Sequence, residues 1–179
     1  MATSDSTSKV SQFPLVLEGE TISILLTKGF VTMVDAIDSD LLQYKWSYCG
    51  SRSPYAKRSK MVKGKSKEIY LHRTILERKL GRDLLVNEVV DHIDNDTLNN
   101  RRDNLRIASL SENQWNSRKP KNNTTGYKGV RRSKGTRYRS SITVKNKYIY
   151  LGCFATAELA YAAYCEAAKK YHGEFARLE

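Results

Sequence analysis

Residues 89–106 have the sequence VVDHIDNDTLNNRRDNLR, and this stretch decides how the middle of the chain folds. Its apolar flanks, NEVVDHI over residues 87–93 and NLRIAS over residues 104–109, are each typical of a short strand. The Asn- and Asp-rich residues 94–104 between them favour a loop, because these side chains hydrogen-bond nearby backbone in turns. The pattern predicts two strands joined by a polar loop.

Helices are predicted on both sides of these strands. The segment LHRTILERKLG, residues 71–81, has the pattern of a short helix that stops at Gly81. After the second strand, Ser109 is followed three residues later by Glu112, which is the spacing of a capping box. A second helix should therefore start there and carry Asn113 in its first turn.

Asp91 and His92 place a carboxylate beside an imidazole, a combination that suits phosphodiester hydrolysis with a bound divalent ion. The carboxylate can hold the metal, and a histidine, with an ordinary pKa of about 6.5, is largely neutral at pH 7 and can accept a proton from water. Neighbouring side chains on a strand point to opposite faces. Both residues can serve one phosphate only if the strand bends or ends there.

Two simpler interpretations compete with this one. A DH dipeptide by itself also occurs as an incidental surface pair. A calcium loop of the EF-hand type could begin at Asp94, but its spacing fails. Leu98 takes a ligand position, Asn99 replaces the required glycine, and Leu105 stands where the bidentate glutamate belongs.

The amino-terminal part favours a small β-rich region. Short β-type segments (LVL, TISILL, FVTMVD and EIYLHR) run from residue 13 to about residue 70, separated by polar breaks. Residues 35–48 fit one helical turn or a loop, and RSKMVKGKSKE, residues 58–68, fits an exposed hairpin tip. The polar residues 1–12 are expected to be disordered.

The composition indicates a polyanionic partner. Among 179 residues, 31 Lys and Arg face 19 Asp and Glu, a formal charge of +12. Nucleic acid is the first candidate because phosphate binding by cations releases counterions; a merely solvated basic surface is the alternative. Three distant cysteines without a CxxC pair indicate neither a disulfide framework nor a cysteine zinc site. No apolar run approaches the roughly 20 residues of a membrane span, so an intracellular, cytoplasmic protein is expected.

The carboxy-terminal part follows a Pro- and Asn-rich linker, RKPKNNTTG, and predicts three strands and one helix. The strands are YKGVRRSK, RYRSSITVK and KYIYLGCF, and the Ala-rich helix spans residues 156–173 with Leu159, Ala163 and Ala167 as its packing stripe. No Asp or Glu occurs from Lys119 to Ala157. One sheet face should therefore be positively charged.

The segments LHR, VVDHIDNDTLNNRRDNLR and SENQWN resemble, in order and spacing, the HNH nucleases of the homing type carried by phages and mobile introns. The likeness extends from about residue 17 to residue 119 and includes TISILLTKGFVTMVDAIDSDLLQYKW and YAKR. It implies a ββα-metal fold with one Mg²⁺ or Mn²⁺, and no zinc. In this resemblance Asp91 and Asn113 hold the ion, His92 activates water and Asn104 orients His92. An asparagine replaces the last histidine of the HNH letters in this subgroup. His72 and Arg73 match the LHR motif, where they contact phosphate or, in the case of His72, pack beside the site.

The segments YKGVRR and YLGCFATAELAYAAYCEAAKKYHGEFA resemble the AP2 domain, in which a three-stranded antiparallel sheet lies in the DNA major groove. The resemblance, with the basic alternation of the strands, implies these DNA-binding residues: Lys128, Arg131, Arg137, Arg139, Thr143, Lys147, Tyr148 and Tyr150. Gly135 and Ser141 replace a tryptophan and a glutamate of plant members, so the plant target sequence does not carry over.

The expected fold class is α+β. A β-rich region leads into a ββα-metal HNH module, and a three-stranded antiparallel sheet packed on one helix follows. The predicted boundaries are 1–12 for the disordered terminus, 13–118 for the nuclease domain with its core at about 70–118, 119–124 for the linker and 125–179 for the AP2-like domain.

The predicted function is metal-dependent endonucleolytic cleavage of double-stranded DNA, by nicking or by cutting both strands. The expected protein is a monomer without a small-molecule cofactor. The alternative is a non-catalytic DNA-binding regulator with an HNH-like scaffold, and RNA binding is a third, weaker possibility.

Overall fold

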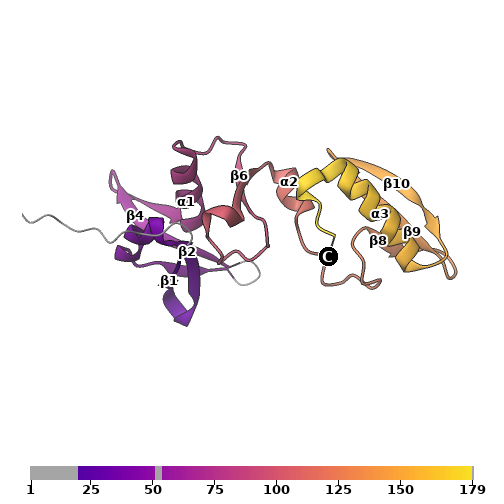
Figure 1. Ribbon diagram of the computed structural model, residues 1–179, viewed down its shortest axis with the longest axis horizontal. Helices are drawn as coiled ribbons and strands as arrows, with labels where there is room; N and C mark the ends of the chain where they lie inside the picture. Colours follow the sequence, from indigo (N-terminus) through magenta and orange to yellow (C-terminus); the bar gives the residue numbers. More distant parts are fainter. Residues whose placement is uncertain (1–19, 51–53, 179) are drawn as a thin grey trace, which may run out of the picture.

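The computed structural model describes residues 20–50 and 54–178. The strand predicted for LVL and the disorder predicted for residues 1–12 lie outside the described residues. Figure 1 shows two units side by side along the long axis, with the short helix α2 at their junction. The last described residues of the carboxy-terminal unit, drawn in yellow, also lie near this junction.

The amino-terminal unit begins with two small antiparallel sheets. In the first, β1 (Thr21–Leu25) pairs with β2 (Val31–Asp35), and the 3-10 turn η1 (Thr27–Gly29) connects them. The second has the order β3-β4-β5, built from β3 (Ser47–Cys49), β4 (Tyr55–Val62) and β5 (Lys65–Tyr70).

The predicted hairpin tip is confirmed, because β4 and β5 are joined by Lys63 and Gly64 alone. Both residues have positive φ, 49° and 75°, which matches the turn to the twist of its strands. Residues 35–48 form the 3-10 helix η2 (Ala36–Gln43) and then β3.

The nuclease-like segment follows without a break. Helix α1 (Leu71–Leu80) starts directly after β5, so the strand predicted to include LHR ends at Tyr70. The two predicted strands are β6 (Val89–His92) and β7 (Leu105–Ala108), which pair antiparallel.

The helix after β7 is α2 (Leu110–Trp115), and its predicted capping box is present. The Ser109 side chain accepts from the Glu112 backbone N–H, and the Glu112 carboxylate accepts from the Ser109 N–H. Both bonds satisfy backbone donors that a helix start leaves unpaired. They fix where α2 begins.

One hydrophobic core unites the β-rich region with α1 and β7. Its fully buried members include Leu41, Trp46, Leu71, Ile75 and Leu105. Burying each such side chain contributes about 1.5–3 kcal/mol. Because these residues come from both halves of the unit, the β-rich region and the nuclease-like segment fold together.

The carboxy-terminal unit has the predicted three-stranded sheet and helix. The sheet, in the order β10-β9-β8, contains β8 (Val130–Arg132), β9 (Tyr138–Val144) and β10 (Lys147–Phe154), and all pairs are antiparallel. Helix α3 (Ala157–His172) covers one face of it, and the short turn η4 (Gly173–Phe175) follows (Figure 1).

The packing stripe predicted for α3 is wrong in part. Leu159 is 55% exposed, whereas Ala160, Tyr164 and Ala168 are buried with Ala167. The small alanines let the helix approach the sheet closely, and the large apolar side chain points away. Gly129 explains part of this fit, since a Cβ there would stand 2.0 Å from the Tyr164 ring.

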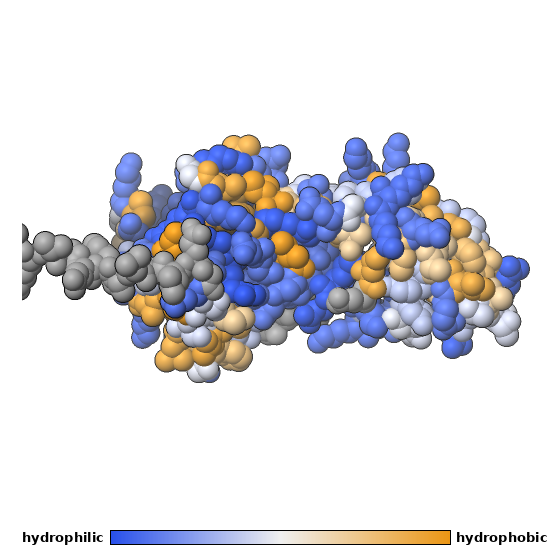
Figure 2. Space-filling model, in the orientation of Figure 1, coloured by the Kyte–Doolittle hydropathy of each residue, from blue (hydrophilic) through white to orange (hydrophobic). Residues whose placement is uncertain are grey.

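The surface is mostly hydrophilic on the face shown in Figure 2, with an apolar patch on the amino-terminal unit. Leu25, Phe30 and Val31 at the end of the β1–β2 hairpin are among the exposed apolar side chains. None of the helices in residues 20–50 and 54–178 is both long and apolar enough to cross a membrane.

A buried carboxylate ties η2 to the segment that precedes β7. Asp38 is 0% exposed and accepts from Arg102 at 2.8 and 3.0 Å. Arg78 of α1 donates to the same carboxylate at 3.3 Å and makes a two-point contact with the exposed Asp40. This network holds α1, η2 and η3 (Arg102–Asn104) together.

We expect Asp38→Ala to lower the free energy of unfolding by about 3 kcal/mol, the low end for a broken buried pair, because Arg102 keeps some contact with water. Asp40→Ala is the matched control, and we expect it to cost less than about 1 kcal/mol, as exposed ion pairs do. Urea unfolding measures both changes. Equal losses in the two variants would contradict the role assigned to Asp38.

Candidate active site

The strand β6 ends at His92, where the chain turns through a hydrogen bond from the Asn95 backbone N–H to the His92 carbonyl at 2.9 Å. This ending was required for Asp91 and His92 to share one site. Both residues line a cleft of about 1060 Å³, together with Asn113 of α2. The other lining residues are Pro54, Tyr55, Val90, Asn95, Asp96, Thr97, Gln114, Ser117, Arg118, Lys119, Pro120, Lys121 and Asn122.

The carboxylate of Asp91 is only 2% exposed and is held from two sides. The Nδ2 of Asn116 donates to its two oxygens at 2.9 and 3.1 Å, and Arg106 Nε donates to Oδ2 at 2.8 Å. Asn116 also donates to the His92 carbonyl at 2.9 Å. The position of Asp91 is therefore fixed by side chains from β7 and from the end of α2.

A chain of hydrogen bonds assigns the proton of His92. Thr32 donates its hydroxyl to the Leu98 carbonyl at 2.6 Å, and its oxygen accepts from Asn100 Nδ2 at 2.7 Å. The Asn100 Oδ1 is then the atom that faces His92 Nε2, at 3.2 Å. Because Oδ1 is only an acceptor, Nε2 carries the proton and Nδ1 is unprotonated.

Burial lowers the pKa of His92 below its ordinary value. The hydrogen bond to Asn100 and the nearby carboxylates, Asp94 first among them, act in the opposite direction but do not cancel this effect. The imidazole is therefore neutral at pH 7, with Nδ1 as its proton acceptor.

Asn104, predicted to orient His92, makes its side-chain hydrogen bonds within the loop that follows His92 and not to the His92 ring. Its Nδ2 donates to Asp94 Oδ1 at 2.9 Å and to the Asn99 carbonyl at 2.8 Å, and its Oδ1 accepts from the Asp94 backbone at 3.1 Å. Asn104 thus closes the loop after β6. The side chain that contacts the His92 ring is Asn100, because the loop turns it into the interior.

His72 packs beside the site, which is one of the two roles left open for it. Its ring lies 5.4 Å from the His92 ring and 5.0 Å from that of Tyr55, between centroids. Burial, and then the neighbouring His92 and Arg73, lower the pKa of His72 to about 3. Arg73 points elsewhere, to Glu77 at 2.9 Å and the Leu84 carbonyl at 3.3 Å.

The donor set suits a hard cation. Asp91 supplies a carboxylate, and the exposed Asn113 supplies an amide oxygen to the same cleft. Such oxygen donors fit Mg²⁺ or Mn²⁺. Within the part of the chain that the structure describes, no group of three or more His, Cys, Asp and Glu side chains is placed to hold a metal ion.

The sequence interpretation missed three residues of this site: Asn100, Arg106 and Asn116. All three lie inside the quoted motifs. Their roles depend on the loop between β6 and β7 and on the end of α2, which the spacing alone does not define. Arg106 could have been found from the strand register, since it stands directly opposite Asp91.

Most of the predicted DNA-binding residues lie exposed on the sheet of the carboxy-terminal unit. The register places Arg131 opposite Arg139, Tyr150 opposite Ser141 and Tyr148 opposite Thr143. Strand alternation puts these side chains on the face that α3 does not cover. The exposed residues are Arg131, Arg137, Arg139, Thr143, Lys147, Tyr148 and Tyr150.

Two predicted DNA contacts differ from the others. Lys128 donates to the carbonyls of Trp115 and Ser117 at 2.5 and 2.7 Å, and burial lowers its pKa to about 8. Its ammonium group lies at the junction of the two units and not on the open sheet face. Lys147 pairs with Val144, so strand alternation places its side chain on the face of the sheet that α3 covers.

Comparison with known proteins identifies the same part of the chain. A family model described as HNH endonuclease matches residues 69–115. Protein 3.8 of Escherichia phage T7 is 38% identical over 90 residues, which is 50% of this chain and 74% of that protein. The uncharacterized HNH endonuclease L560 of Acanthamoeba polyphaga mimivirus is 34% identical over 108 residues, 60% of this chain and 53% of that protein.

The family match identifies an HNH endonuclease domain over residues 69–115, and this domain holds the strand pair, α2 and the Asp91–His92 pair. The chain belongs to the HNH endonuclease family. It spans about half the length of the mimivirus relative, and the family match ends at Trp115, before the carboxy-terminal unit.

We expect Asn100→Asp to raise the pKa of His92, because a carboxylate facing Nε2 stabilises the charged imidazolium more than an amide does. An NMR pH titration of the His92 ring measures the shift. Asn146→Asp, in the exposed turn between β9 and β10, makes the same charge change elsewhere and should leave this pKa unaltered. An unchanged pKa in Asn100→Asp would refute the assigned contact.

Proposed function

We propose that this chain is a metal-dependent DNA endonuclease of the homing type that uses one Mg²⁺ or Mn²⁺ ion. The observation that carries the proposal is the cleft in which Asp91, His92 and Asn113 meet. His92 is neutral there, with Nδ1 as its acceptor. The mimivirus relative, which is named as an HNH endonuclease, supports the nuclease activity.

Each residue of the cleft has a distinct role in this proposal. His92 Nδ1 takes a proton from the water that attacks the scissile phosphorus, while Asn100 holds the ring through Nε2. Asp91 and Asn113 would hold the divalent ion, which would supply positive charge next to the phosphate and the leaving 3′ oxygen. The products are 5′-phosphate and 3′-hydroxyl ends.

The connection between the two units supplies cations to the same cleft. The Pro- and Asn-rich segment RKPKNNTTG was predicted only as a linker, yet its Arg118 and Lys121 line the cleft and are exposed. A phosphate backbone next to Asp91 and Asp96 needs such cations to offset repulsion. We propose that Arg118 and Lys121 bind the phosphates that flank the scissile bond.

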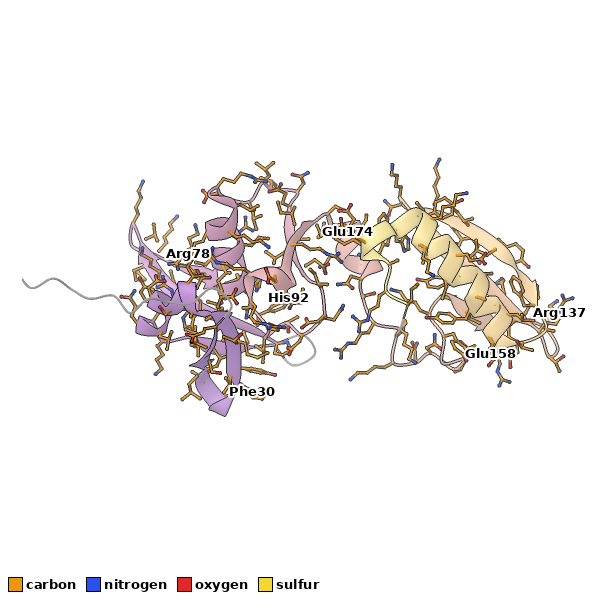
Figure 3. All side chains as sticks on the ribbon, viewed as in Figure 1. Phe30, Arg78, His92, Arg137, Glu158 and Glu174 are labelled. Atoms are coloured by element: carbon orange, nitrogen blue, oxygen red, sulfur yellow. The ribbon has the colours of Figure 1, made fainter. Side chains whose placement is uncertain are left out.

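The carboxy-terminal sheet is the proposed docking surface for double-stranded DNA. Its open face carries arginines and tyrosines, which supply phosphate contacts, base-edge hydrogen bonds and apolar contact. Arg137 lies at the far end of this unit from His92 (Figure 3). The proposed AP2-like docking therefore anchors the protein at a distance from the cut.

We expect the protein to relax or linearise supercoiled plasmid in the presence of Mg²⁺ or Mn²⁺. Loss of the base in His92→Ala should lower the rate by about 10²–10⁴-fold, and a chelator should abolish cleavage. His72→Ala is a useful comparison, because that ring packs beside the site without a predicted part in proton transfer. Gel analysis of plasmid forms gives the rates.

If the wild-type protein cleaved none of a varied set of DNA sequences, the proposal that it is an enzyme would be refuted. If DNA binding persisted in that case, the non-catalytic regulator would be the remaining interpretation. Cleavage that is equal in the wild type and His92→Ala would contradict the role of His92.

We expect Arg131→Ala to weaken DNA binding and to reduce the slope of log affinity against log salt by about 0.9, the value for one lost phosphate contact. Lys169→Ala, on α3 behind the sheet, is the matched charge control. Fluorescence anisotropy at several salt concentrations measures both. Identical slopes for the two variants would show that the open sheet face does not bind DNA.

A further inference from the structure

The guanidinium group of Arg106 contacts residues of both units. Its Nε donates to Asp91 Oδ2 at 2.8 Å. Its Nη1 donates to the Glu174 carbonyl at 3.0 Å, and its Cζ lies 3.9 Å from the centre of the Phe175 ring. Figure 3 places Glu174 at the junction, on the side of its unit nearer to His92.

The strand register makes this shared contact possible. Asp91 of β6 pairs with Arg106 of β7, so their side chains project from the same face of the two-stranded sheet. Both are poorly exposed, 2% for the Asp91 side chain and 15% for that of Arg106. A charge-assisted hydrogen bond with so little water around it holds its partners more firmly than a surface ion pair.

Further contacts dock the carboxy-terminal unit around the same point. Trp115 at the end of α2 stacks on His172, with ring centroids 4.2 Å apart and an interplanar angle of 8°. His172 is buried there, and its Nε2 lies 3.1 Å from the Thr143 carbonyl oxygen. Lys128 bonds the end of α2 as well.

These contacts surround the groups that hold Asp91. Asn116, the second group on that carboxylate, directly follows Trp115 in sequence. The carboxy-terminal unit therefore packs next to both residues that bond Asp91, which are Arg106 of β7 and Asn116 at the end of α2.

We infer that the segment Glu174–Phe175 positions Asp91 through Arg106, so that the carboxy-terminal unit completes the nuclease centre in addition to docking DNA. Arg106 is thus a positioning residue, and Phe175 is the residue of the second unit on which its guanidinium rests. The inference relies on the proposed function for its catalytic meaning. Its structural content, the dependence of the Arg106–Asp91 bond on Phe175, stands independently.

The side chain of Glu174 carries little of this effect. Its carboxylate is 75% exposed and 3.4 Å from Arg106, a geometry in which an ion pair contributes little. The Glu174 backbone carbonyl and the Phe175 ring supply the close contacts. A ring face next to a poorly hydrated guanidinium is a favourable cation–π arrangement.

The test compares Phe175→Ala, Phe175→Leu, Phe175→Tyr and Glu174→Ala in the full chain. The direct readout is the NMR signal of the Arg106 Nε–H and its exchange with solvent. We expect a slowly exchanging signal in the wild type, Phe175→Tyr and Glu174→Ala, and exchange on the order of tenfold faster in Phe175→Leu and Phe175→Ala. Phe175→Leu preserves apolar volume, which separates loss of the ring from loss of folding.

The second readout is the Mn²⁺ concentration needed for half-maximal plasmid cleavage, with DNA affinity measured in parallel. Phe175→Leu should raise that concentration roughly tenfold, as loss of support behind a metal ligand does, while DNA affinity stays unchanged. An Arg106 signal that exchanges equally slowly in all variants would overturn the inference. A wild type that never cleaves DNA would instead overturn the proposed function, and the exchange data would still decide the role of Phe175.

Discussion

The pairing of Asp91 with Arg106 across two short strands is the interaction on which the rest of the site depends. Because the β6–β7 register puts these residues opposite each other, a nearly buried carboxylate receives a charged partner at 2.8 Å. A buried carboxylate without such a partner would be costly. The same guanidinium group contacts Glu174 and Phe175 of the carboxy-terminal unit. One side chain therefore bonds Asp91 in the first unit and packs against the second.

The amino-terminal β-rich region supports this arrangement from the other side. Its Thr32 accepts the hydrogen bond that orients Asn100 and therefore His92. Its Asp38 fixes Arg102 shortly before β7 begins. The region is thus a structural part of the nuclease unit, which explains why one hydrophobic core runs through both.

The connection between the units has more than one role. It lines the cleft beside Asp91 and His92 with Arg118 and Lys121, and it leads into Lys128, which bonds the end of α2. In the proposed division of labour, with docking in one unit and cleavage in the other, the connection supplies cations to the cleft.

The sequence by itself determined the local elements and the residue types of the site. The capping box at Ser109 and Glu112, the β6–loop–β7 pattern and the Asp91–His92 pair all depend on neighbours within a few residues, and such short-range signals are visible in one chain. Only the tertiary structure decided that Asn100 replaces Asn104 beside His92, that Lys128 faces α2 and that Phe175 supports Arg106. Those contacts join residues whose approach is set by loop conformation and by packing between units, and no periodicity encodes the direction in which such side chains point.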